Sequence, residues 1–193
     1  MTNLCLAQQP DADALLDRDP LALLMGMLLD QQIPMEKAFA GPYVLAQRMG
    51  VGRLDAAGIA DCDPGAFTKM FVGPPAIHRF PGAMAGRVQA LARQIADEYG
   101  GDAAAVWSTA ASGAELFARL GSLPGFGPQK AKIFLALLGK QRGMRLPGWR
   151  EVSAPYGTDG IYHSVADVTI PETLLKVREY KKAMKAAARP ASH

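Results

Sequence analysis

The chain has 193 residues, of which 49% are hydrophobic and 20% charged, and its formal net charge is +3. These values suit one compact domain, or two lobes of one chain, and exclude a disordered polypeptide or a histone-like polycation. Cys5 and Cys62 lie far apart without a CxxC spacing. That spacing argues against a disulfide framework, a zinc site and a four-cysteine iron–sulfur cluster, and we expect two buried thiols.

Hydropathy along the chain argues against a membrane protein. The sequence contains no run of about 18 apolar residues, so we expect no membrane span. Its first residues lack the basic flank and the long apolar run of a signal peptide. We therefore expect a soluble cytoplasmic protein.

Signals for helix starts dominate the first hundred residues. Asp19-Pro20 and Asp63-Pro64 each combine an N-cap residue with proline at the first helical position. The segment after Pro20, LALLMGMLLDQQ, is apolar on all sides and predicts a buried helix. Apolar residues at helical spacing predict an amphipathic helix over 86–99, which Gly100 ends.

The second half of the chain is also predicted to be helical. Ser112 and Glu115 form the S-x-x-E pattern of a capping box at the start of one helix, and a second apolar helix follows within a few residues. The segment 143–169 is the least regular. Few apolar and polar residues alternate anywhere, so the predicted fold class is all-α.

The last predicted helix begins at Pro171 and is strongly basic. It forms either a face that binds along DNA or a solvated surface around an apolar stripe. Its cations are Lys176, Arg178, Lys181, Lys182, Lys185 and Arg189.

A short glycine-rich segment, 121–132, joins two predicted helices. Gly125 and Gly127 allow positive φ angles and let a ligand approach the backbone closely. The helix that starts near Pro128 presents unpaired N–H groups and the positive end of its dipole, which suit a phosphate. An ordinary turn between two helices has the same glycine and proline pattern.

The sequence LPGFGPQKAKIFLALLG closely resembles the helix–hairpin–helix of DNA glycosylases of the endonuclease III and AlkA type, the HhH-GPD superfamily. Its pattern there is L-P-G-[apolar]-G-x-x-[TK]-A before an apolar helix. DPLALLMGMLLDQQIPMEKA resembles an early helix of these proteins, and GRVQALARQIADEYGGD resembles the helix before their hairpin. The resemblance covers roughly residues 19–142.

The resemblance implies one helical unit over 1–193 with a groove between two lobes. One lobe would span about 20–142 and contain the helix–hairpin–helix at 114–139. The other would combine about 1–19 with 143–193. The protein is expected to be a monomer, and its partner would be double-stranded DNA in the nucleoid.

By match to the family motif, the hairpin would hold the DNA backbone. Phosphate-binding N–H groups are expected around Gly125, Gly127 and Gln129, and Lys130 and Lys132 would add positive charge. Such contacts position the protein but do not read the sequence. Gln32 matches a glutamine that fills the gap left by a flipped nucleotide; a solvated amide is the alternative.

The resemblance implies no organic or redox cofactor, and the absence of four clustered cysteines argues against the iron–sulfur cluster of the endonuclease III branch. In this family three hairpin carbonyls often hold a monovalent cation, either sodium or potassium. The matching carbonyls belong to Gly121, Leu123 and Phe126.

The chain departs from the family pattern at the nucleophile. Gln129 occupies the position of the lysine that forms a Schiff base in bifunctional members. Lys130 is one residue further and is rotated about 100° around the helix. We interpret it as a phosphate contact; a solvated charge and a displaced nucleophile are the alternatives.

The family aspartate is also missing at its expected spacing, where Pro147-Gly148-Trp149 stands. Glu151 is the nearest carboxylate and is our candidate for stabilising charge on the sugar; a surface partner of Arg150 is the alternative. Further candidate carboxylates are Asp30, Glu36, Asp159 and Asp167.

Aromatic residues after the hairpin helix are candidates for the base pocket. Trp149, Tyr162 and His163 lie in the irregular segment, and rings there can stack on an extruded base. They can equally fill the core between lobes.

The predicted function is a DNA glycosylase of base-excision repair, monofunctional and without lyase activity, with water as the nucleophile. A non-catalytic binder of distorted DNA on the same fold is the alternative, and only the enzyme would produce abasic sites. A helical protein that binds a small molecule or a protein partner is the third hypothesis, which predicts no appreciable DNA affinity.

Overall fold

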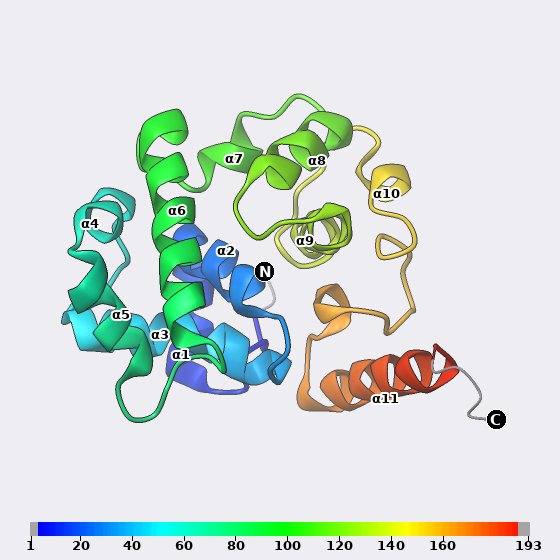
Figure 1. The fold of residues 1–193 in the computed structure, drawn as a ribbon. Helices are drawn as coiled ribbons and strands as arrows, with labels where there is room; N and C mark the ends of the chain where they lie inside the picture. Colours follow the sequence, from blue (N-terminus) through cyan, green and yellow to red (C-terminus); the bar gives the residue numbers. More distant parts are fainter. Residues whose placement is uncertain (1–3, 189–193) are drawn as a thin grey trace.

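The computed structural model describes residues 4–188, and the regular structure in this range is entirely helical, with no β-strand. The predicted all-α fold class is therefore confirmed. The elements, shown in Figure 1, are α1 (Pro10–Arg18), α2 (Pro20–Leu29), α3 (Met35–Met49), α4 (Ala56–Asp61), α5 (Pro64–Val72), α6 (Pro81–Tyr99), α7 (Ala105–Ser108), α8 (Gly113–Ser122), α9 (Pro128–Gln141), α10 (Trp149–Val152), the 3₁₀ turn η1 (Val165–Asp167) and α11 (Pro171–Ala187).

Most helix starts fall where their capping signals predict. The Asp19 carboxylate accepts hydrogen bonds from the N–H groups of Leu21 and Ala22 at 3.0 and 3.3 Å, and caps α2. Helix α6 begins at Pro81 rather than at Gly86, because a proline at its first position lets one more turn bury apolar side chains.

The predicted capping box at α8 is only half formed. The Ser112 hydroxyl accepts a hydrogen bond from the N–H of Glu115 at 3.2 Å. The Glu115 carboxylate accepts instead from the N–H of Ala111, at 2.8 Å. The cap therefore satisfies a donor one residue outside the expected position.

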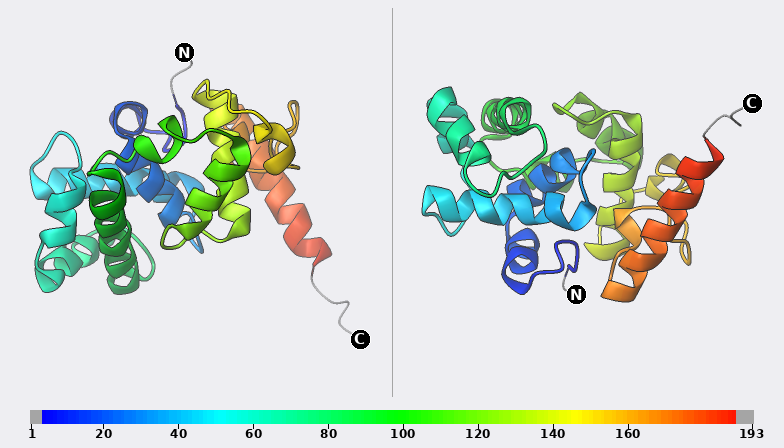
Figure 2. Two further views of the ribbon diagram at one scale, coloured as in Figure 1. Left: turned by 90° about the horizontal axis from the view of Figure 1, so that it is seen from above. Right: turned by 60° about the horizontal axis from the view of Figure 1, so that its bottom comes forward.

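The helices pack mainly with neighbours along the chain. Helix α2 packs against α1, α3 and α6, and α6 also carries α4 and α5. Helix α9 packs against α8, α10 and η1, and α11 rests on η1 (Figure 2). An ion pair between Asp17 and Arg142, at 2.6 Å, joins α1 to the end of α9. The predicted lobe boundaries at 19/20 and 142/143 stay a prediction.

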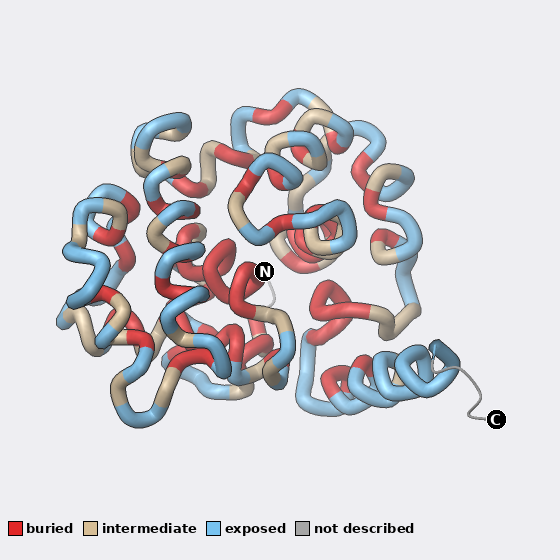
Figure 3. The backbone as a smooth tube through the Cα atoms, in the orientation of Figure 1, coloured by how far each residue is buried: buried red, intermediate tan, exposed pale blue. Residues whose placement is uncertain are grey.

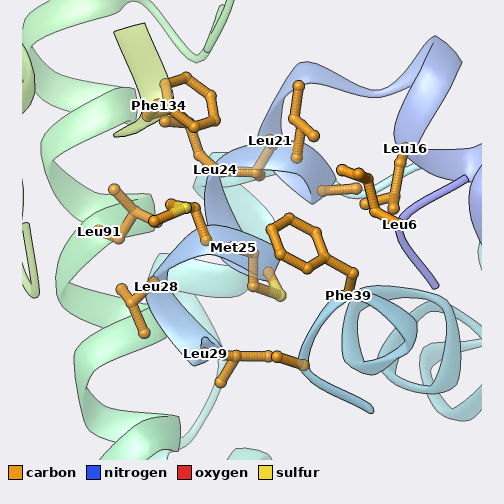
Figure 4. Close-up of a cluster of buried hydrophobic side chains, with 14 of the residues drawn as sticks. Leu6, Leu16, Leu21, Leu24, Met25, Leu28, Leu29, Phe39, Leu91 and Phe134 are labelled. Carbon is orange, nitrogen blue, oxygen red and sulfur yellow. The ribbon is translucent and has the colours of Figure 1, made fainter. Parts of the chain in front are cut away.

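Helix α2 lies at the centre of the core. All of its residues from Leu21 to Leu29 are buried, as the all-apolar sequence predicts (Figure 3). Figure 4 shows its leucines and Met25 between Phe39 of α3, Leu91 of α6 and Phe134 of α9. The buried apolar side chains form one cluster that reaches from Leu4 to Val177.

Both cysteines are free thiols. Each is partly exposed, which corrects the expectation of full burial. Both lie at the edges of helices, Cys5 before α1 and Cys62 at the end of α4, where neighbouring side chains cover them incompletely.

Candidate functional site

The segment between α8 and α9 forms a tight hairpin. Gly125 has a φ of +80°, and a Cβ there would lie 3.1 Å from the Leu28 side chain, so glycine meets both a backbone and a packing requirement. Phe126 is buried and meets the Phe134 ring edge-on at a centroid distance of 6.0 Å. The Phe126 side chain therefore packs into the core from the hairpin.

The outer face of this hairpin presents unused hydrogen-bond donors. Within residues 4–188, the N–H groups of Gly125, Gly127, Gln129 and Lys130 donate to no protein acceptor. Gly127 is exposed and nothing would lie within 4 Å of a Cβ added there. The donors lie at the start of α9, where the helix dipole favours an anion.

A cavity of about 460 Å³ lies beside the hairpin. Its wall is formed by residues from the end of α2, the first turns of α9, the segment after α10 and helix α11. Figure 1 shows the ribbons of these elements. The residues that line the cavity are Met27, Asp30, Gln31, Gln129, Lys130, Ile133, Tyr156, His163, Tyr180, Lys181 and Met184.

Lys130 lines this cavity. Its Nζ atom donates to the carbonyls of Met27 and Leu28, both at 2.8 Å, and thereby binds the carbonyl end of α2. Burial lowers the pKa of Lys130 to about 8, against the opposing charge of Asp30. This placement differs from the predicted phosphate contact, because the ammonium group is engaged inside the protein.

Asp30 lines the same cavity at the C-terminal end of α2. Burial raises the pKa of its carboxyl group above the ordinary value, while Lys181 and Lys130 oppose the shift. Within the described residues its carboxylate makes no salt bridge with any cation. Asp30 is therefore a carboxylate that faces a cavity without being committed to a structural ion pair.

The other candidate carboxylates have different surroundings. Glu151 is exposed on α10 and does not line the cavity. Asp159 pairs with Arg150 at 3.1 Å on the surface, and Glu36 pairs with Arg178. Asp167 is buried against Lys140 at 2.5 Å. It also accepts from the N–H groups of His163 and Ser164, which makes it a structural residue.

Polar residues of α9 near the hairpin contact the segment after α10. The Gln129 amide donates to the Tyr156 hydroxyl at 3.0 Å, and the Lys132 ammonium donates to the Ala154 carbonyl at 3.3 Å. Gln129 is exposed and lines the cavity, and its amide nitrogen is not a nucleophile.

The three aromatic residues predicted for the base pocket lie in three different environments. Trp149 is buried in the core, where Gly139 and Gly113 make room for it, so its assignment to the pocket is wrong. Tyr162 does not line the cavity, and the Lys176 Nζ atom lies 4.4 Å from the centroid of its ring. His163 does line the cavity and stacks on Tyr180, with ring centroids 3.9 Å apart and an interplanar angle of 13°.

Tyr180 lines the cavity and was missed by sequence analysis. Its helix is predicted to carry an apolar stripe, and nothing in that pattern indicates a place opposite His163 for Tyr180. The His163 Nδ1 atom is buried and has no hydrogen-bond partner within the part of the chain described here.

Gln32 lies in the turn after α2 with an exposed side chain and a φ of +56°. Buried His78 supports this turn: its Nε2 atom lies 2.9 Å from the Gln31 carbonyl, and its Nδ1 atom accepts from the N–H of Phe80 at 3.0 Å. Phe80 is 43% exposed. His78 thus holds two surface turns together, one carrying Gln32 and the other carrying Phe80, a residue that sequence analysis did not single out.

The carbonyls expected to bind a monovalent cation differ in their engagement. The Leu123 carbonyl accepts from the N–H of Phe126 at 3.1 Å. Those of Gly121 and Phe126 accept no hydrogen bond from residues 4–188. Two of the three therefore have their full acceptor capacity, which fits a cation.

Family models and curated proteins were compared with the chain. No protein-family model matches it, and no curated protein matches it. Among the described residues, no helix has both the length and the hydropathy needed to cross a bilayer.

Proposed function

We propose that this protein is a base-excision DNA glycosylase with the two-lobed helix–hairpin–helix architecture. One observation carries the proposal: helix α9 presents unpartnered N–H groups at its start and, within the same turns, lines the cavity that holds Asp30. The same helix therefore provides donors for a phosphate and part of the wall of the cavity in which we place the reaction. A base extruded beside the hairpin would need to travel only a short way to reach the carboxylate.

The hairpin binds the DNA backbone. Phosphate oxygens accept hydrogen bonds from the N–H groups of Gly125, Gly127 and Gln129, and the exposed glycine backbone lets them approach. A monovalent cation on the carbonyls of Gly121, Leu123 and Phe126 would add positive charge at the same edge. These contacts hold the duplex without reading its sequence.

Extrusion of a nucleotide leaves a gap in the duplex that the protein fills. Gln32 is exposed in a turn that buried His78 holds in place, and Phe80 is exposed on the neighbouring turn. A polar amide replaces the hydrogen bonds of the lost base, and a phenyl ring replaces stacking. The paired turns stabilise the distorted duplex.

Asp30 supplies the carboxylate for hydrolysis, in place of Glu151. The C1′–N bond breaks with its electron pair on the departing base, and the sugar gains positive charge that the carboxylate stabilises. A water oxygen then bonds to C1′ and loses a proton to the carboxylate, and this proton passes on to the departed base or to solvent, which restores the ionised carboxylate. The products are a free base and an abasic site.

The enzyme is monofunctional in this proposal. Gln129 has no amine with which to form a Schiff base. The Lys130 amine is fixed on two carbonyls as a hydrogen-bond donor and is protonated below about pH 8. It therefore serves as a fixed cation beside Asp30 rather than as a nucleophile.

The test is single-turnover base release by Asp30→Asn and by Glu151→Gln on a duplex that the wild type cleaves. Asp30→Asn should lower the rate by about 10²- to 10³-fold, the usual cost of losing one preorganised electrostatic group, and leave duplex affinity intact. Glu151→Gln should retain the wild-type rate. In the wild type, the acidic limb of the pH profile should lie above the range of an ordinary carboxyl group, because burial raises the pKa of Asp30.

The reverse result, with Glu151→Gln inactive and Asp30→Asn active, would return the catalytic role to Glu151. Binding to every lesion duplex without base release would favour the non-catalytic DNA-binding protein instead.

A further inference from the structure

The exposed half of α11 carries its cations on one face. Arg178, Lys181, Lys182 and Lys185 follow the i, i+3, i+4, i+7 spacing that aligns side chains along a helix, and all four are exposed. We call these four residues the basic stripe. The acidic residues of α11, Glu172 and Glu179, lie more than about 100° around the helix axis from the centre of the stripe.

The position of α11 brings the basic stripe to the edge of the cavity. Thr173, Leu174 and Val177 are buried and anchor the first half of the helix. The same side of the helix continues into Tyr180 and Met184, which line the cavity. The second half of α11 extends past η1 with an exposed surface (Figures 2 and 3).

Two cations of the stripe face carboxylates of the protein and two do not. Arg178 pairs with Glu36, and Lys181 lies close enough to Asp30 to oppose the rise in its pKa. Among residues 4–188, neither Lys182 nor Lys185 makes a salt bridge. On a chain whose net charge is only +3, four cations on one helix face, two of them without a carboxylate partner among residues 4–188, complement an extended anion.

We propose that the basic stripe is a second binding site for the phosphate backbone of duplex DNA, separate from the hairpin and adjacent to the same cavity. The inference rests on the proposed function and adds a second point of contact to it. From Arg178 to Lys185 the stripe extends about 10 Å along the helix axis. That length corresponds to about three phosphates of one strand at their rise of about 3.4 Å.

Two contacts at one cavity also give α11 a positioning role. Its basic stripe holds a strand while Tyr180, on the adjacent face, lies stacked on His163 inside the cavity. Duplex bound at both the hairpin and α11 is therefore aligned with its extruded base toward Asp30.

The test compares the salt dependence of duplex affinity between two double variants. Lys182→Gln with Lys185→Gln removes two stripe charges that make no intramolecular ion pair, at little cost in helix propensity. Arg53→Gln with Lys69→Gln is the matched control, since both residues are exposed on the α4–α5 side of the molecule, away from the cavity. Affinity is measured by fluorescence anisotropy with a labelled duplex over a range of salt concentrations.

The stripe variant should reduce the slope of log affinity against log salt by about 1.8, because each lost phosphate contact contributes about 0.9. The control should reproduce the wild-type slope. Equal slopes for the stripe variant and the wild type would overturn the inference, even if the protein binds and cleaves DNA.

The anisotropy titration, together with base-release and vesicle-binding assays of the same proteins, separates failure of the inference from failure of the proposed function. Wild-type protein without DNA affinity at moderate salt would refute both. A reduced slope without base release in any duplex would support the stripe and refute the glycosylase. Loss of binding to phosphatidylserine vesicles in the stripe variant, with an unchanged DNA slope, would reassign the stripe to anionic lipid and overturn the inference.

Discussion

At the residue scale, the central feature is that Asp30 and Lys130 line one cavity. They are distant in sequence, and each shifts the other's pKa against the effect of burial. The spacing after the hairpin motif predicts Glu151 as the candidate carboxylate, because a motif match considers only residues at a fixed distance along the chain. Asp30, a carboxylate that lines the cavity, lies at the end of α2, and only the packing of α2 against its neighbours places it there.

The lowered pKa of Lys130 predicts a pH-dependent stability. Between about pH 8 and its ordinary value of 10.5, the unfolded chain binds a proton at this lysine that the folded chain does not. The free energy of unfolding of the wild type, relative to Lys130→Met, should therefore rise with pH across this window and stay level below it. Urea denaturation of both proteins from about pH 7 to 10 measures the difference, and a difference independent of pH would show that Lys130 is not desolvated.

At the element scale, local signals predict the helices well. Asp-Pro pairs place the starts of α2 and α5, and the all-apolar sequence of α2 predicts its burial. The side-chain partners of helix ends are less predictable, as the half-formed capping box of Ser112 and Glu115 shows. A cap depends on the exact path of the preceding residues, which the capping pattern does not specify.

One substitution in the hairpin should weaken DNA binding without affecting folding. Gly127 has an ordinary negative φ, and the space that a Cβ would occupy there is open, so Gly127→Ala should fold normally. A methyl group there obstructs a phosphate, and duplex affinity should fall roughly tenfold to a hundredfold, the equivalent of one charge-assisted hydrogen bond. Gly52→Ala, equally exposed and unobstructed, is the control. Equal affinity of the two variants in an anisotropy titration would contradict the phosphate-binding role.

Because α9 packs closely against α10, a glycine substitution in α9 should affect stability differently from one on the exposed face of α6. A Cβ at Gly139 would overlap the Trp149 ring, so Gly139→Ala should destabilise the fold by about 1–3 kcal/mol. Gly86→Ala, in the exposed interior of α6, should be neutral or stabilising by up to about 1 kcal/mol. Urea denaturation compares both with the wild type, and an unaffected Gly139→Ala would refute the core position of Trp149.

At the scale of the whole molecule, the candidate site is formed by segments that are far apart in the sequence and line one cavity. The hairpin is predictable because its glycines, proline and following helix are contiguous. The stack of His163 on Tyr180, and the cavity that α2, α9 and α11 share, depend on the tertiary arrangement of those helices. Trp149 shows what the sequence cannot predict. A tryptophan in an irregular segment has the same neighbours in sequence whether its ring lines a pocket or fills the core.

The cavity beside the hairpin is, in our central claim, the place where a base is excised. The most direct measurement is an assay of the wild type on duplexes that each carry one lesion, with and without alkali treatment. The panel includes alkylated purines, uracil, oxidised pyrimidines and 8-oxoguanine. Strand breaks that appear only after alkali on at least one duplex are the predicted result. Intact strands across the whole panel, despite tight binding, would contradict the claim, and breaks without alkali would contradict the monofunctional role assigned through Gln129 and Lys130.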